Sequence, residues 1–228
     1  MRFLSLLLVL SLFIACGEEE EAAEAETEEA AATAAAAESG ETGPSLDLQS
    51  IVGTKLYGFR KIPDRMMVKG RVAVGTYISA KKNKAGAHLL LELTVSPCAG
   101  CTPTSEEKMW KRQTTQLLKA KRLVDKEAIL EMEKVKWTGS AGYGHYSLLF
   151  KAKKRGRAKS FQAEHAYAAR FNDGHHLVEL KVSPCDDKGH PFAKTREELV
   201  KAATKTSLKK TVRRAWAKLG KHFPPLGT

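Results

Sequence analysis

The sequence predicts an α+β domain over residues 45–228, built from an antiparallel sheet of about six strands and two main helices. Three observations lead to this fold class: one segment occurs twice, a hairpin signal precedes each copy, and a helix-start signal follows each copy. The expected order is ββα-ββ-ββα. Because hairpins pair neighbouring strands antiparallel, one sheet covered by helices accounts for all of these elements.

The repeated segment is the clearest strand signal in the chain. His88–Cys98 and His175–Cys185 align at an offset of 87 residues, and eight of the eleven positions are identical. Each copy is rich in β-branched and apolar residues and closes on Ser-Pro-Cys. Each is therefore expected to form a strand that the proline terminates.

Four more strands are expected around the two copies. One strand precedes each copy and is joined to it by a turn, at Lys81–Gly86 in the first and at Asn172–Gly174 in the second. The Asp-Gly step of the second turn is a strong hairpin signal. Two further strands lie between the copies. The four are expected at Arg71–Ser79, Ile129–Thr138, Gly144–Lys153 and Ala163–Asn172.

A helix is expected after each copy, because Thr104–Glu107 and Thr195–Glu198 both match the capping-box pattern. The second helix also has apolar residues at helical spacing, which is typical of a face packed on a core. These residues are Leu199, Ala203, Leu208, Val212, Ala215 and Leu219.

This order of elements resembles the PsbP/Mog1 sandwich fold, which occurs in photosynthetic extrinsic proteins and in bacterial envelope lipoproteins. The resemblance spans residues 50–222 and implies a role in binding or assembly, for example as a protein–protein assembly factor of an envelope complex. The repeat also allows a second arrangement, in which two similar half-domains face each other.

Residues 1–15 have the pattern of a secretory signal peptide, since Arg2 precedes about a dozen apolar residues, too few for a stable transmembrane helix. The sequence Ile14-Ala15-Cys16-Gly17 resembles the bacterial lipobox, although Phe13 stands where leucine is more usual. This resemblance implies cleavage before Cys16 and a membrane anchor through lipid on that residue. The expected location is the bacterial cell envelope, with the domain in the periplasm or on the cell surface. Gly17 is not acidic, which favours the outer membrane.

Residues 16–44 are expected to form an acidic tether after the lipidated cysteine. This segment contains ten Glu and no aromatic residue, so it cannot bury enough surface to fold. It serves as a spacer or, alternatively, as a pseudo-ligand that a stronger polyanion displaces from the domain. Residues 1–44 contain one Arg and these ten Glu, a formal charge of −9. Because the whole chain has a formal charge of +12, residues 45–228 hold +21.

Two groups of cations predict an anion-binding surface for lipid phosphate, lipopolysaccharide or an acidic polymer. Export argues against nucleic acid as the partner, and so does the absence of any tryptophan among the cations of the hairpin loop described next. The first group lies in one hairpin loop: Lys151, Lys153, Lys154, Arg155, Arg157 and Lys159. The second group has four-residue spacing on the last helix: Lys201, Lys205, Lys209 and Arg213.

Cys98, Cys101 and Cys185 are the disulfide candidates in an oxidising envelope. Either a Cys98–Cys101 or a Cys98–Cys185 bridge accounts for two of them and leaves the third thiol free. The Cys-x-x-Cys pair is also compatible with a thiol-disulfide oxidoreductase. However, the expected helix starts only at Thr104, so neither thiol lies at a helix N-terminus, where its pKa would be lowered.

The sequence contains no nucleophile elbow, P-loop or Gly-rich dinucleotide turn. Its strand histidines have no spacing typical of a metal site. These histidines are His88, His145, His165, His175 and His176. We therefore predict a non-catalytic binding module that uses neither a metal nor a cofactor.

Overall fold

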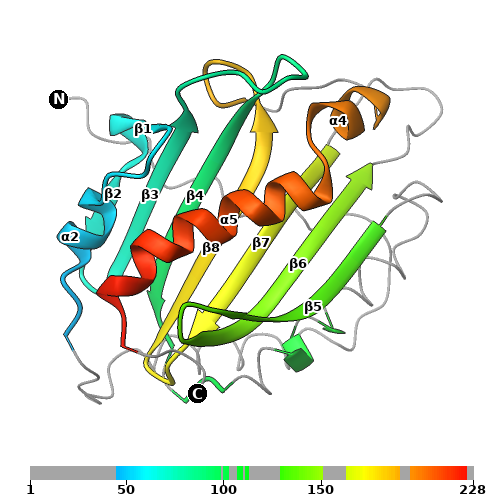
Figure 1. The fold of residues 1–228 in the computed structure, drawn as a ribbon. Helices are drawn as coiled ribbons and strands as arrows, with labels where there is room; N and C mark the ends of the chain where they lie inside the picture. Colours follow the sequence, from blue (N-terminus) through cyan, green and yellow to red (C-terminus); the bar gives the residue numbers. More distant parts are fainter. Residues whose placement is uncertain are drawn as a thin grey trace, which may run out of the picture. The chain divides into compact units, whose positions relative to one another are not determined.

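The structure is a computed structural model that describes residues 45–98, 100–102, 107–109, 111–112, 129–150, 163–190 and 196–224. The chain divides into two units, residues 1–41 and 42–228, and every described residue belongs to the second unit. The predicted signal peptide, Cys16 and the tether therefore lie outside the described residues. Figure 1 shows the described part as one sheet with helix α5 across one face.

Two of the described strands are very short, and the others span eight to eleven residues. The strands are β1 (Phe59–Lys61), β2 (Met67–Lys69), β3 (Val72–Ser79), β4 (His88–Pro97), β5 (Ile129–Trp137), β6 (Ser140–Phe150), β7 (Ala163–Asn172) and β8 (His176–Cys185). The helices are α2 (Leu48–Gly53), α4 (Arg196–Ala202) and α5 (Lys205–Leu219), with 3-10 turns η1 (Pro63–Arg65) and η2 (Gly220–His222). Residues 107–109 and 111–112 are also helical.

The sheet is antiparallel throughout, with the order β1-β3-β4-β8-β7-β6-β5 and with β2 beside β3. The predicted α+β class is therefore confirmed. The sheet has eight strands where the sequence predicted about six. The two additional strands, β1 and β2, contain three residues each, too few to show a period-two pattern.

The two copies of the repeated segment are neighbours, because β4 pairs antiparallel with β8. Leu93 lies opposite Leu180, its own equivalent in the repeat, and the pairing runs outward from there to His88 opposite Cys185. An approximate two-fold axis therefore passes through the sheet at the Leu93–Leu180 pair. The copies lie side by side in one sheet and do not form two half-domains that face each other.

The main core lies between the sheet and α5. The aromatic rings of Phe171, Trp216 and Phe223 form a stack there, and Trp137 lies tilted against Phe171. Phe171 and Trp216 are closest, with ring centroids 4.1 Å apart. The indole Nε1 of Trp216 donates a hydrogen bond to the carbonyl of Trp137 at 3.1 Å. Because large aromatic rings dominate core energetics, this stack fixes α5 on the sheet.

Two glycines of β6 allow close packing on the face that carries α5. A Cβ atom at Gly144 would lie 2.0 Å from the hydroxyl of Tyr167, and a Cβ atom at Gly142 would lie 2.0 Å from the carbonyl of Arg170. The Tyr167 side chain thus crosses over Gly144 and donates a 2.7 Å hydrogen bond to Glu133 on the edge strand β5. Glycine is required at both positions for this approach.

The last helix differs from the prediction. The sequence predicted one helix after Thr195, but the chain breaks after Ala202 and forms α4 and α5. Thr204 has extended backbone angles and caps α5 together with Ser207, which satisfies backbone N–H groups of the first turn. The Asn83 side chain donates a hydrogen bond to the carbonyl of Ala202 at 2.5 Å, which closes the end of α4.

The hairpin between β5 and β6 also differs from the prediction. The sequence placed the start of the second strand at Gly144, whereas β6 begins at Ser140. Thr138 and Gly139 both have positive φ angles and make a two-residue turn, the geometry that matches the twist of paired strands. β6 therefore pairs with β5 from Ser140 onward.

Candidate anion-binding surface

Helix α5 carries the surface that we consider as the candidate site. Its inner side is apolar, as predicted. The six residues predicted to pack on the core are all buried: Leu199 on α4, Ala203 between the two helices, and Leu208, Val212, Ala215 and Leu219 on α5. Trp216 is fully buried as well. The inner side therefore fixes which residues of α5 face solvent.

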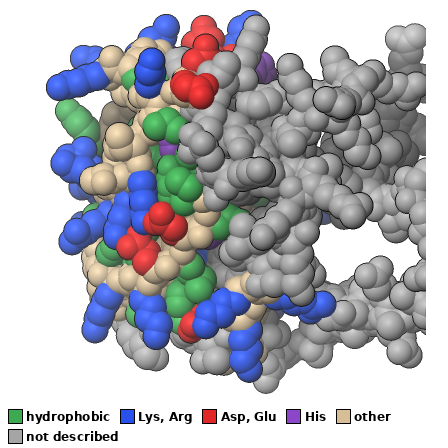
Figure 2. All heavy atoms as spheres, turned by 90° about the vertical axis from the view of Figure 1, so that its right-hand side faces the viewer, with side chains coloured by type: hydrophobic (Ala, Val, Ile, Leu, Met, Phe, Trp, Pro, Cys, Tyr) green, Lys and Arg blue, Asp and Glu red, His purple; other side chains and the backbone are tan. Residues whose placement is uncertain are grey.

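The outer side of α5 and the turn after it is cationic. We call its five exposed cations the basic ridge: Lys210, Arg213, Arg214, Lys218 and Lys221. Residues 205–222 contain neither Asp nor Glu. Among the residues that the structure describes, no carboxylate lies within ion-pairing distance of any of the five. In Figure 2 the face that carries α5 lies at the left, and Lys and Arg side chains gather along that edge.

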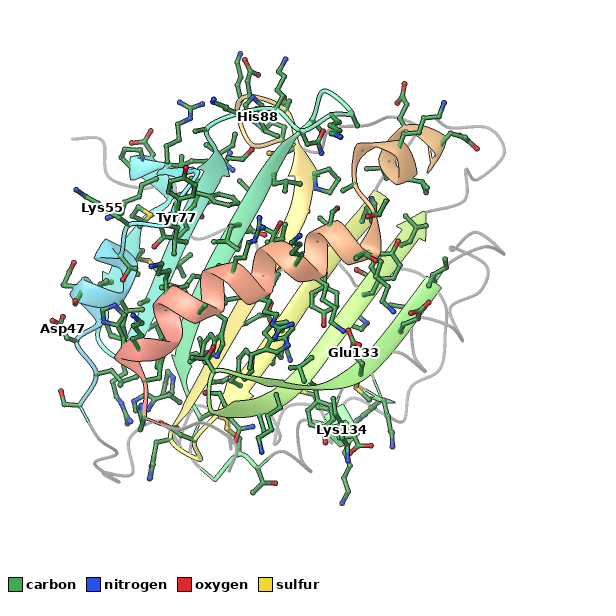
Figure 3. The ribbon with its side chains drawn as sticks, in the orientation of Figure 1. Asp47, Lys55, Tyr77, His88, Glu133 and Lys134 are labelled. Carbon is green, nitrogen blue, oxygen red and sulfur yellow. A yellow bond between two sulfur atoms is a disulfide. The ribbon has the colours of Figure 1, made fainter. Side chains whose placement is uncertain are left out.

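The flank of α5 toward β5 has a different electrostatic character. Lys205 forms an ion pair with Glu131, and Lys209 forms one with Glu133 at 2.7 Å. Figure 3 shows Glu133 beside α5 on the face of the sheet that the helix covers. The ammonium of Lys205 also lies 5.7 Å from the ring centroid of Tyr146. These contacts fasten α5 to the edge strand.

The shared hydrogen bonds change the pKa values in this flank. Burial raises the pKa of the Glu133 carboxyl, but hydrogen bonds from Lys209 and Tyr167 outweigh burial, so this pKa lies below its usual value. The hydrogen bond to Glu131 raises the pKa of Lys205. Glu133 and Lys205 are therefore charged at neutral pH, and both lysines of this flank already have partners.

The predicted stripe of four cations is thus divided in the structure. Lys201 is exposed on α4, Lys205 and Lys209 are half-buried in ion pairs, and Arg213 belongs to the basic ridge. The expectation that all four stack along one helix face is wrong, because the break before Thr204 separates Lys201 from the other three. The loop cations Lys151, Lys153, Lys154, Arg155, Arg157 and Lys159 lie outside the described residues.

The sequence prediction missed most of the basic ridge. Lys210, Arg214, Lys218 and Lys221 were not among the predicted cations. The apolar face of the helix could have identified them. On a helix of 3.6 residues per turn, Lys210 and Arg214 lie on the side opposite the predicted core residues. The prediction instead used four-residue spacing, which selected Lys205 and Lys209, and both of these lie on the flank toward β5.

The disulfide joins Cys98 to Cys101, and Cys185 is a free, buried thiol. The alternative Cys98–Cys185 bridge is wrong because of the register. Cys185 lies opposite His88 at one end of the β4–β8 ladder, whereas Cys98 follows Pro97 at the other end. Ten residues of strand span roughly 33 Å, far beyond the Cα separation that a disulfide permits.

The Cys98–Cys101 turn is attached to the second copy of the repeat. The backbone N–H of Cys98 donates to the carbonyl of His175 at 2.8 Å, and that of Gly100 donates to the carbonyl of Gly174 at 3.0 Å. Cys101 is buried. Burial raises the pKa of the Cys185 thiol to about 12, so this thiol is protonated at neutral pH and a poor nucleophile.

The buried histidines have separate structural partners. His88 Nδ1 lies 2.8 Å from the carbonyl of Ser79, and His165 Nδ1 lies 2.8 Å from the carbonyl of Leu199. His176 Nδ1 lies 3.2 Å from Asp173. Within the described ranges, no three His, Cys, Asp or Glu residues converge in a way that could hold a metal ion.

No family model matches the chain, and no curated protein or solved structure shows significant similarity to it. The residues that the structure describes include no helix of sufficient length and apolarity to span a membrane.

Proposed function

We propose that this chain is a lipid-anchored protein of the bacterial cell envelope whose domain binds an anionic envelope component through the basic ridge. Lipid phosphate, lipopolysaccharide and acidic polymers share the required chemistry. One observation supports this proposal above the others: five exposed cations lie on one side of α5 and η2, a segment without any acidic residue.

The energetics of the ridge favour an anionic ligand. Like charges three or four residues apart on a helix destabilise it by a few tenths of a kcal/mol per pair. Lys210 and Arg214 are such a pair, and so are Arg214 and Lys218. A ligand that brings several negative charges relieves this repulsion, and the surrounding positive field accelerates its association.

The ion-paired flank defines which cations take part. Lys205 and Lys209 hold α5 against Glu131 and Glu133. They support the helix, and the exposed cations of the ridge are free to contact the ligand. Ligand binding is therefore expected to weaken with rising salt, because salt screens exposed charges far more than partly buried pairs.

The test uses the chain from residue 16 onward with Cys16→Ser, so that lipid does not contribute. Its binding is measured to lipopolysaccharide, to phosphatidylglycerol vesicles and to inorganic polyphosphate over a salt series. We expect tight binding to at least one ligand at low salt and release at high salt. The double variant Lys210→Glu/Arg214→Glu should lose at least about 25-fold in affinity, since a cation near an anionic surface contributes roughly a factor of five.

A matched control variant is Lys134→Glu/Lys136→Glu. Both lysines are exposed on β5, and they alternate with Glu131 and Glu133 onto the face of the sheet away from α5. The change of net charge is the same. Equal loss of binding in both variants would contradict the assignment of the ridge, and binding to none of the three ligands would contradict the function.

A second candidate function is a protein–protein assembly factor of an envelope complex. Tyr57 favours it, because this side chain is 98% exposed immediately before the edge of the sheet at β1. An exposed aromatic ring of this kind is enriched at protein interfaces. Tyr57→Ser should then abolish a partner interaction that survives high salt, while the salt-sensitive binding of the ridge remains.

A further inference from the structure

We infer that the basic ridge lies flat on an anionic lipid bilayer, with the α5 axis parallel to the membrane and without insertion into the acyl chains. This inference rests on the proposed function and selects the phosphate groups of a membrane surface as the ligand. Three observations support it: the shape of the ridge, the absence of large exposed apolar residues from α5, and the contact between the ridge and a segment near the N-terminal end of the domain.

The ridge is a convex surface. Fifteen residues of α5 form a helix about 22 Å long, and Figure 1 shows this helix lying across the front face of the sheet. Lys210 and Arg214 lie about one turn apart on the outer side of α5, and the exposed Lys221 follows in η2. A straight convex line of cations meets a plane of phosphates along its full length.

The outer side of α5 lacks the residues needed for insertion. Between the cations it presents Thr206, Ser207 and Ala217, all exposed. The three large apolar residues with high exposure among the described residues, Tyr57, Met67 and Val200, all lie outside α5. Helices that insert into the interface require Leu, Phe or Trp on the membrane side, so binding at this ridge is electrostatic.

The position of the ridge suits a domain that is tethered to the membrane. Thr54, at the end of α2, lies 3.0 Å from His222 at the end of the ridge. The C-terminal end of α2, near the start of the described chain, thus lies next to the C-terminal end of the ridge. Residues 16–44 number 29, and such a length reaches at most about 100 Å when extended, which allows the ridge to contact the membrane that holds the anchor.

The experiment measures partition of the Cys16→Ser chain onto vesicles that contain 0, 15 or 30% phosphatidylglycerol in phosphatidylcholine. We expect binding that rises with the anionic fraction and reverses at high salt. Lys210→Glu/Arg214→Glu should lower the partition coefficient at least about 25-fold. Lys134→Glu/Lys136→Glu should change it by less than about three-fold, because those lysines face away from the bilayer.

A site-specific probe tests the orientation. Cys98 and Cys101 are bonded and Cys185 is buried, so a single introduced cysteine is the only reactive thiol among the described residues. A fluorophore at Ala217→Cys should become shielded from aqueous acrylamide on vesicle binding, whereas a fluorophore at Lys136→Cys should not. Neither should be quenched by quenchers located in the acyl chains.

The outcomes separate this inference from the proposed function. Binding to polyphosphate or lipopolysaccharide without binding to vesicles would overturn the bilayer inference and leave the anion-binding function in place. Equal shielding of both probes, or quenching of the Ala217→Cys probe from within the bilayer, would overturn the flat orientation. Failure to bind every anionic probe would overturn both.

Discussion

Leu93 and Leu180 occupy the same position in the two copies of the repeat and lie directly opposite each other in the β4–β8 ladder, where both side chains are fully buried. The two-fold relation gives them equivalent positions in the centre of the sheet. We expect Leu93→Ala and Leu180→Ala each to lower the free energy of unfolding by about 2–5 kcal/mol, and by similar amounts. Urea denaturation followed by circular dichroism measures both values.

The control for this pair is Val200→Ala on α4. Val200 is exposed, so its truncation should change the free energy of unfolding by less than about 0.5 kcal/mol. A cost below about 1 kcal/mol at one leucine, with a large cost at the other, would contradict the equivalence of the two positions.

Gly144→Ala is expected to destabilise the domain, because the added methyl group would overlap the Tyr167 hydroxyl. Overpacking of this kind costs about 1–3 kcal/mol. Tyr167→Phe alone should cost about 1 kcal/mol through loss of the hydrogen bond to Glu133. In a double-mutant cycle by urea denaturation, Tyr167→Phe should cost less, or become favourable, in the Gly144→Ala background. Purely additive effects would show that the hydroxyl does not occupy the space above Gly144.

We expect the buried His165 to lower the free energy of unfolding in mild acid. Burial lowers its pKa below the ordinary 6.5, although the hydrogen bond to the carbonyl of Leu199 partly opposes this shift. The unfolded chain therefore binds the proton first as the pH falls below about 6.5, and protonation favours unfolding. The contribution of neutral His165 is present above that pH and declines below it.

The measurement compares urea denaturation at pH 7.5 and pH 5.5 in the parent chain and in His165→Gln. The difference between the two pH values should be smaller in the variant. Glu133 and Asp173 have lowered pKa values, so their contributions are lost only at more acidic pH and do not interfere in this range. An unchanged pH dependence in the variant would exclude His165 as its source.

The pairing of the cysteines determines how many thiols should react in the folded and in the denatured chain. In the Cys16→Ser chain, a thiol reagent should label no cysteine in the folded state at pH 8, because Cys185 is buried and its pKa is raised to about 12. Denaturation without reductant should expose one thiol, and denaturation with reductant should expose three. Mass spectrometry after digestion should find Cys98 linked to Cys101, and a peptide that links Cys98 to Cys185 would contradict the structure.

The sequence predicted the fold class because the repeated strands and their hairpins are encoded locally. Period-two patterns and an Asp-Gly turn identify β4, β7 and β8 without any knowledge of their partners. The register of β4 against β8 depends on contacts between segments far apart in the chain, so the choice between the two disulfides could not be made before the structure.

The candidate surface was predicted in part for the same reason. The helical pattern of α5 was visible, and Arg213, one of the predicted anion-binding candidates, is exposed on α5. The partners of Lys205 and Lys209 lie on β5, more than 70 residues earlier. No local sequence pattern predicts ion pairs between segments so far apart. The break at Thr204 was also missed, although the apolar spacing changes there, from four residues between Leu199 and Ala203 to five before Leu208.

The two-fold axis in the sheet has a consequence for the two helices that follow the repeats. An axis perpendicular to a sheet maps each face onto itself, and α5 crosses the central strands (Figure 1), so a symmetric mate would occupy the same volume. Glu107, in the helical residues after the first copy, accepts a hydrogen bond from Tyr143, which alternates to the opposite face from Gly144. The face that carries α5 therefore has room for only one helix across its centre, and the helical residues after the first copy contact the sheet from the other face.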